Sequence, residues 1–100
     1  MPKYKLESEY QSHLIERLYN IFGDDDCIVL KQEARQGIPD LLILFRDRWA
    51  FLECKRSEKE PHQPNQDYYV DWANHFSFAR FIFPENEEEV LYDLQQSFRS

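Results

Sequence analysis

An uninterrupted apolar run, Leu41 to Phe45, constrains the fold more than any other feature of this chain. A run of this length is typical of a strand that is buried on both faces. A polar turn at 46–48 follows it, and then a second, mostly apolar segment at 49–55. The pattern predicts a hairpin whose two strands are joined by a connection of four to five residues.

Helical and strand patterns surround this hairpin. Residues 6–22 place apolar side chains at helical spacing, and Gly23 ends the pattern. The other predicted elements are a strand at 27–30, a helix at 67–75, a strand at 78–83 and a helix that begins at the acidic residues 87–89. The order α-β-β-β-α-β-α predicts one mixed α/β domain over residues 1–100.

Composition excludes several classes of protein. Apolar residues make up 42% of the chain, aromatic residues 16%, and there are two glycines, which indicates a globular and not a disordered chain. No apolar run approaches the roughly 20 residues of a membrane span. The first residues also lack the apolar stretch of a signal peptide. We therefore expect a soluble cytoplasmic protein, with Cys27 and Cys54 as free thiols.

The net charge of −7 argues against a nucleic-acid partner until its distribution is considered. Residues 31–59 carry seven basic and five acidic side chains, whereas both flanking segments are acidic. Phosphate contacts anchor a protein on nucleic acid without reading sequence. The residues predicted to make them are Lys31, Arg35, Arg56 and Lys59. The alternative is that these are scattered charges that keep the protein soluble.

Chemistry-bearing residues occur at one end of the predicted hairpin. Asp40 opens the first strand, and Glu53 and Lys55 close the second. Side chains alternate along a strand, so Glu53 and Lys55 share a face and Cys54 points the other way. Two carboxylates suit Mg²⁺, and a lysine can orient or deprotonate water or stabilise developing charge. The alternative is a turn aspartate beside an ordinary ion pair.

The segment Gly37-Ile38-Pro39-Asp40, followed by Glu53-Cys54-Lys55, resembles the G-x-P-D…E-x-K core of PD-(D/E)XK nucleases. Within that group the chain most resembles the small stand-alone VRR-NUC domains of phages and bacteria, over residues 6–94. The resemblance implies a restriction-endonuclease-like αβββαβ core, with a mixed central sheet flanked by helices. It also implies a nuclease that uses Mg²⁺ or Mn²⁺ and the backbone carbonyl of Cys54 as a metal ligand.

Two further site positions follow from the resemblance. The first is a glutamate on the first helix, for which Glu7 and Glu9 compete. At about 100° per residue, Glu7 falls in line with the apolar Leu14, where a carboxylate needs a partner or a metal. Glu7 is therefore preferred. The second is a glutamine at the start of the crossover helix, where Gln66 fits and Gln63 is the competitor.

Other polar and aromatic residues carry weaker signals. The three histidines lack metal-ligand spacing, so His13, His62 and His75 are predicted to lie on the surface. Trp49 and Trp72 are predicted to belong to the core.

The leading hypothesis is a metal-dependent DNA endonuclease that selects branched DNA, such as Holliday junctions or flaps. Nothing in the sequence reads bases, so we expect recognition by shape. The resemblance implies a homodimer in a bacterial cell or a phage-infected host. One alternative is a catalytically inactive nucleic-acid-binding or interaction module on the same fold. Another is a small regulatory protein without a nucleic-acid partner.

Overall fold

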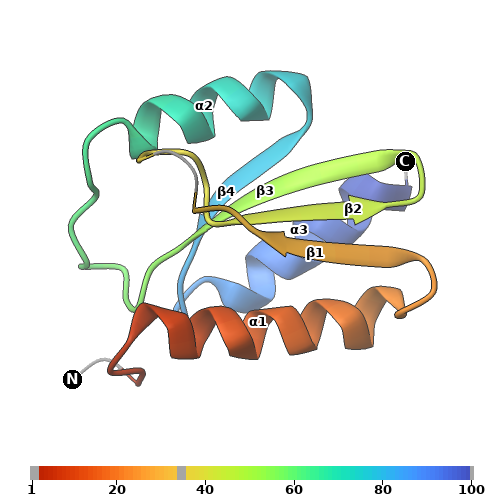
Figure 1. Ribbon diagram of the computed structural model, residues 1–100, viewed down its shortest axis with the longest axis horizontal. Coiled ribbons are helices and arrows are strands. Elements are labelled where there is room, and N and C mark those ends of the chain that lie inside the picture. Colours follow the sequence, from red (N-terminus) through yellow and green to blue (C-terminus); the bar gives the residue numbers. More distant parts are fainter. Residues whose placement is uncertain (1–2, 34–35, 100) are drawn as a thin grey trace.

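Four strands form one mixed sheet in the computed structural model, which describes residues 3–33 and 36–99 (Figure 1). The strands are β1 (Cys27–Lys31), β2 (Leu41–Phe45), β3 (Arg48–Cys54) and β4 (Phe78–Ile82), in that order across the sheet. Strand β2 is antiparallel to both β1 and β3, and β4 is parallel to β3. The predicted mixed α/β fold with a central sheet is therefore confirmed.

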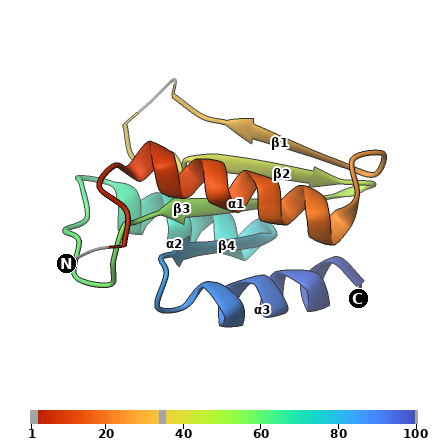
Figure 2. The ribbon, with the colours of Figure 1, turned by 90° about the horizontal axis from the view of Figure 1, so that it is seen from below.

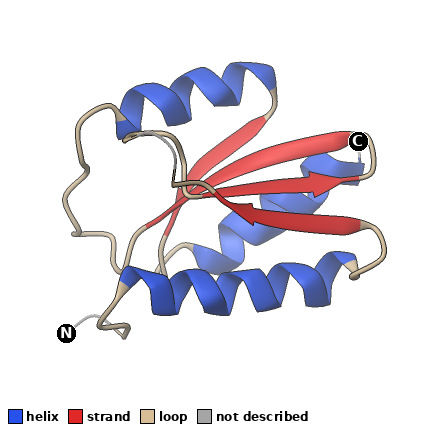
Figure 3. Ribbon diagram, in the orientation of Figure 1, coloured by secondary structure: helices blue, strands red, loops and turns tan. Residues whose placement is uncertain are grey.

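Three helices flank the sheet (Figure 3): α1 (Glu7–Phe22), α2 (Gln66–Phe76) and α3 (Glu87–Arg99). Helix α1 lies along the β1 side of one face, and α3 lies along the β4 side of the same face (Figure 2). Helix α2 packs over β3 and β4 on the other face, as the crossover that a parallel strand pair requires. None of the helices in the described part of the chain is long and apolar enough to cross a membrane.

Helix α1 is fixed against the sheet along its whole length. Its inner face carries three fully buried side chains, those of Tyr10, Leu14 and Leu18. At its start, the Leu6 N–H donates a hydrogen bond to Glu9 Oε1 (2.9 Å). At its end, Gly23 adopts a φ of 86° and donates its N–H to the Tyr19 carbonyl (2.8 Å). The hydrogen bond at the start of the helix fixes its first turn, which begins with Glu7.

The β2–β3 hairpin has a tighter turn than predicted. Phe45 pairs with Arg48, so only Arg46 and Asp47 connect the strands, and the expected connection of four to five residues is wrong. Arg46 has a φ of 55°, in the left-handed region that lets a chain reverse within two residues. Strand β3 ends at Cys54, and the other predicted boundaries differ from the observed ones by no more than one residue.

One half of the sheet face on the α2 side is not covered by a helix of the described chain. Two rows of paired side chains run from β1 to β3 there: Ile28, Leu44 and Trp49, and Leu30, Leu42 and Phe51, of which Phe51 at the border packs against the cluster of Val70, Ala73 and Ala79 under α2. Ile28 and Leu30 are exposed, and the β2 residues of the rows are half-buried. The prediction that β2 is buried on both faces is therefore wrong, because only its face toward α1 and α3 is covered.

Helix α2 extends this apolar surface. It turns Val70 and Ala73 to the sheet, so that the side chain of Trp72 is 52% exposed and that of Phe76 is 66% exposed. The predicted core position of Trp72 is therefore wrong. An apolar hollow of about 110 Å³ lies between α2, β3 and the loop before β2. We call the two rows, together with Trp72 and Phe76, the open face.

Helices α1 and α3 are joined by ion pairs as well as by apolar packing. Glu87 Oε2 lies 2.9 Å from His13 Nε2 and 2.7 Å from Arg17 Nη1, and Arg17 also pairs with Glu88. His13 lies at the surface as predicted, with 35% of its side chain exposed, and its ring stacks on Tyr10. Burial alone would raise the pKa of Glu87, but hydrogen bonds from Arg17 and His13 lower it below its ordinary value.

Candidate metal centre

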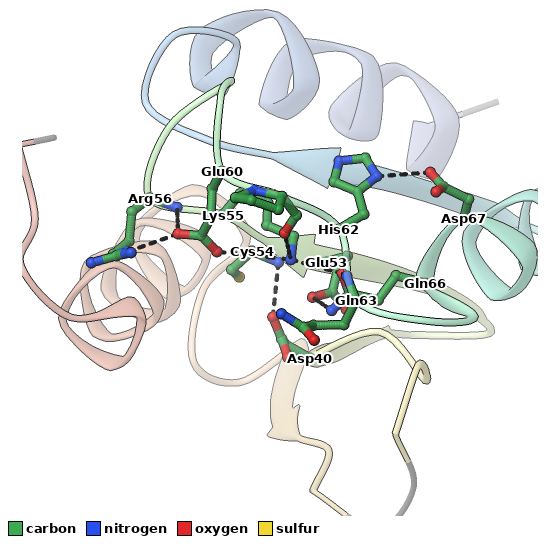
Figure 4. A network of polar contacts seen from close by, with 11 residues as sticks. Asp40, Glu53, Cys54, Lys55, Arg56, Glu60, His62, Gln63, Gln66 and Asp67 are labelled. Carbon is green, nitrogen blue, oxygen red and sulfur yellow. Dashed lines mark hydrogen bonds and ion pairs between the residues drawn. The ribbon is translucent and has the colours of Figure 1, made fainter.

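Asp40 is tied to the end of β3 by a hydrogen bond in which the Cys54 N–H donates to Asp40 Oδ2 (2.9 Å) (Figure 4). The loop before Asp40 packs closely on the start of α2. Gly37 has a φ of 93°, and a Cβ there would lie 2.8 Å from Asn65 Cβ. Glycine alone combines this backbone conformation with this close approach. The loop therefore brings Asp40 and the start of α2 to the same end of the sheet.

Three carboxylates from separate parts of the chain meet at this end. Glu7 from α1, Asp40 from the loop before β2 and Glu53 from β3 each offer an oxygen, and these oxygens lie within 4.8 Å of one another. Opposite oxygen ligands of Mg²⁺ stand about 4.2 Å apart, since each bond is about 2.1 Å long. The cluster thus has the size and the donor type of a site for one hard divalent cation.

Without a cation, the burial and mutual repulsion of these carboxylates raise the free energy of the folded protein. Burial, and then the nearby Glu60 and Asp40, raise the pKa of Glu7 to about 8. Burial, and then the Asp40 carboxylate, raise the pKa of Glu53 to about 9. Glu53 Oε1 is buried, and no donor among the described residues reaches it. An unpartnered buried oxygen in a cluster of three carboxylates fits a bound divalent cation, whose two positive charges would offset most of their negative charge.

Gln66, the first residue of α2, connects Glu53 to Lys55. Its Nε2 donates to Glu53 Oε2 (2.9 Å), and its Oε1 accepts from Lys55 Nζ (2.7 Å) (Figure 4). Lys55 is 2% exposed, and its Nζ also donates to the Pro61 carbonyl (3.3 Å). The competitor Gln63 is exposed and contributes its backbone N–H to Gln66 Oε1 (2.7 Å). The side-chain bridge is therefore formed by Gln66.

Glu9 and Glu7 have separate places in the structure. Glu9 is exposed and accepts the hydrogen bond from Leu6 at the start of α1, whereas Glu7 lies in the cluster. The structure therefore brings together Glu7, Asp40, Glu53, Lys55 and Gln66, all candidates from the sequence.

Glu60, which the sequence did not single out, also borders the cluster. Its Oε1 accepts hydrogen bonds from Arg56 Nε (2.7 Å) and the Arg56 N–H (3.1 Å), and its Oε2 lies 3.8 Å from Lys55 Nζ. Burial would raise the pKa of Glu60, but hydrogen bonds from Glu7 and Arg56 lower it. The loop at 57–65 shows no periodic pattern, so nothing in the sequence points to this residue.

The candidate phosphate contacts are dispersed. Lys31, at the end of β1, and Lys59, in the loop after β3, are exposed. The Arg56 side chain already has partners within the protein, because its guanidinium donates hydrogen bonds to Glu60 and to the Lys5 carbonyl (2.7 Å). Arg35 lies outside the described residues.

The two remaining histidines lie outside the cluster. His62 and His75 are exposed, as predicted. The His62 ring stacks on Phe81 with centroids 4.0 Å apart, and its Nδ1 lies 2.8 Å from Asp67 Oδ1.

The chain is similar to a solved structure described as a VRR_NUC domain. The two share 29% sequence identity, and the match has a TM-score of 0.58 and covers 77% of this chain and 82% of the other. No family model matches the chain, and no curated protein matches it at a significant level. The described residues therefore adopt a VRR-NUC-like fold.

Proposed function

We propose that this chain is a Mg²⁺- or Mn²⁺-dependent DNA endonuclease of the PD-(D/E)XK kind, acting in the cytoplasm of a bacterial or phage-infected cell. The observation that carries the proposal is the convergence of Glu7, Asp40 and Glu53 beside the buried Lys55. The likeness to the structure described as a VRR_NUC domain supports the same activity.

Each residue of the cluster has a role in this proposal. A bound divalent cation supplies charge neutralisation at the phosphodiester and acidifies water. Glu7, Asp40 and Glu53 would hold the cation, and the Cys54 carbonyl would be a further ligand. Lys55, oriented by Gln66, deprotonates or orients the attacking water or stabilises charge on the phosphate. Gln66 can also hydrogen-bond that water, since it stands between Glu53 and Lys55.

Branched DNA, such as a Holliday junction or a flap, is the proposed substrate. The contacts to phosphate are assigned to Lys31, Arg35, Arg56 and Lys59. Non-specific affinity for duplex DNA rests on basic groups, and this chain has a net charge of −7. Selection by the shape of the DNA fits this negative net charge. At a branch point several phosphates lie close together, so a few basic residues can contact more of them than on a long duplex.

The open face is proposed as the interface of a homodimer. The open face contains two apolar rows of the sheet together with Trp72 and Phe76. This is more exposed apolar surface than singly scattered residues would give. A second copy brings the same apolar surface, and a two-fold axis closes the assembly. Two such active sites would address two strands of a junction.

Cleavage of labelled DNAs tests the proposal. The panel is a four-way junction, a flap, a single strand and a linear duplex, each with Mg²⁺, Mn²⁺ or EDTA. The wild type is compared with Lys55→Ala and with Lys3→Ala, a substitution of an exposed lysine outside the cluster. We expect metal-dependent cutting of branched DNA that falls by at least about 100-fold in Lys55→Ala and is unchanged in Lys3→Ala.

Two results would count against the proposal. If folded protein binds junctions in Mg²⁺ but cuts none of the four DNAs, it is a catalytically inactive binding module. Equal cutting by the wild type and Lys55→Ala would remove the assigned role of the lysine.

A further inference from the structure

Glu60 lies where three groups of the candidate metal centre come together. Its side chain is 12% exposed, although it belongs to the loop that connects β3 to α2. One of its carboxylate oxygens accepts both Arg56 hydrogen bonds, and the other lies 3.8 Å from Lys55 Nζ. Glu60 also lies near enough to Glu7 to contribute to the raised pKa of that carboxyl group. These contacts fix the orientation of the Glu60 carboxylate relative to Arg56 and Lys55.

We propose that Glu60 is a positioning residue that holds the Lys55 ammonium group beside the carboxylate cluster and not within it. The inference rests on the proposed nuclease function, in which Lys55 acts on water or on the phosphate. Glu60 reaches the reacting groups only through Lys55 and Glu7, so it is assigned no chemical step of its own.

The partners of Lys55 explain why a charge is needed at position 60. A lysine ammonium has three donors on a flexible stem. Two of its acceptors, Gln66 Oε1 and the Pro61 carbonyl, are neutral. Glu60 is the carboxylate that forms an ion pair with it in the described structure. Without that charge, the nearest negative groups are the cluster carboxylates, and Lys55 would be drawn onto them in competition with a cation.

Arg56 keeps Glu60 in place for this task. Its backbone N–H and its Nε–H converge on one oxygen of Glu60, which turns the other oxygen toward Lys55. The Arg56 guanidinium also donates to the Lys5 carbonyl just before α1. A glutamine at position 60 could still accept the Arg56 hydrogen bonds, so Glu60→Gln removes the charge and leaves the shape.

The experiment compares Glu60→Gln and Glu60→Asp with Glu58→Gln, which changes an exposed glutamate of the same loop. Thermal unfolding first verifies that each variant is folded. Pulsed acetylation of the metal-free proteins, followed by peptide mass spectrometry, then measures how well Lys55 is protected. Finally, kcat and KM are measured with Mg²⁺ on the DNA that the wild type cuts best.

We expect Lys55 to be acetylated several-fold faster in Glu60→Gln, because its charged partner is gone. We expect kcat to fall by about 10-fold, at the lower end of the effect of residues that orient metal-site groups, with KM for DNA unchanged. Glu60→Asp should recover part of both properties, and Glu58→Gln should match the wild type. A lower kcat with unchanged acetylation, or no change in either, would overturn the inference.

The two proposals fail in different ways. A wild type that cuts no DNA removes the proposed function, while the acetylation of metal-free protein still decides whether Glu60 holds Lys55. If Glu60→Gln does not fold, Arg56→Gln carries the comparison, because it removes the side-chain hydrogen bond that turns Glu60 toward Lys55. Equal Lys55 protection in Arg56→Gln and the wild type would then contradict the inference.

Discussion

Glu53 illustrates what one residue contributes to this site and what it costs. Its carboxylate is fully buried, with Gln66 as its donor, and its pKa is raised from an ordinary value of 4.5 to about 9. A carboxyl group whose pKa is raised on folding lowers stability progressively as the pH rises from the unfolded value to the folded one. Between these two values the metal-free fold therefore loses stability because of Glu53.

Glu53→Gln should accordingly stabilise the metal-free protein. The amide can still accept the Gln66 hydrogen bond but cannot ionise, so we expect a gain of about 0.5–2 kcal/mol at pH 7.5 in EDTA. The stabilisation that Mn²⁺ gives to the wild type should disappear at the same time. Thermal unfolding with EDTA or Mn²⁺ measures both effects, with Glu58→Gln as the control. A variant that is less stable than the wild type in EDTA would contradict this account.

The positions of the site residues were predictable to different degrees. Strand alternation predicts that Glu53 and Lys55 share a face, and the hairpin predicts that Asp40 lies near the end of β3, where it bonds Cys54. The choice of Glu7 over Glu9 was also predictable, because the face of a helix on which a residue lies depends only on its spacing from nearby residues. Glu60 was not predictable, since its place depends on the path of a loop without periodicity.

At the scale of elements, local spacing was sufficient for the order of all seven helices and strands. Local spacing did not predict which faces of these helices and strands are covered by other parts of the chain. The run at Leu41–Phe45 indicates burial on both faces, but the position at which α2 packs decides which half of the sheet is covered. The contact between α1 and α3 is another such case, because His13 and Glu87 lie far apart in the sequence.

The ion pairs between α1 and α3 should make stability depend on pH in the acid range. The pKa of Glu87 is lowered on folding, so its contribution is fully present above the unfolded value of 4.5 and is lost as the pH falls through the folded value. We expect Glu87→Gln to cost about 1–3 kcal/mol at pH 7, because it weakens hydrogen bonds from Arg17 and His13.

Urea unfolding at several pH values tests this expectation. The difference between the wild type and Glu87→Gln should shrink below pH 4.5, whereas the exposed control Glu89→Gln should match the wild type throughout. A difference that stays constant down to pH 2 would show that the ion pairs do not cause it.

At the scale of the whole molecule, the open face is an apolar surface that a single chain exposes to solvent. Antiparallel strands often leave one sheet face to solvent, but that face is then polar, whereas here the apolar Ile28 and Leu30 of β1 are exposed, as is Trp72 of α2. The sequence alone could not reveal this surface, since apolar strand residues have the same pattern whether a helix of the same chain or a second copy covers them.

Trp72→Lys should convert the proposed dimer to a monomer. One chain has a mass of 12.2 kDa, so sedimentation velocity separates the two states clearly. The matched control is Tyr92→Lys, because Tyr92 is 61% exposed but lies on α3, away from the open face. We expect Tyr92→Lys to remain dimeric and Trp72→Lys to nick junctions on one strand only. A wild type that sediments as a monomer at micromolar concentration would refute the assembly.

The three carboxylates of the candidate metal centre come from a helix, a loop and a strand at positions 7, 40 and 53. The unfolded chain therefore has no site, and a cation would bind the native state alone. At a free metal concentration 100 times the dissociation constant, such a ligand adds about 2.7 kcal/mol to the stability of the native state. Metal supply in the cell would then govern how long each molecule survives proteolysis, and starvation for the ion would deplete the protein as well as its activity.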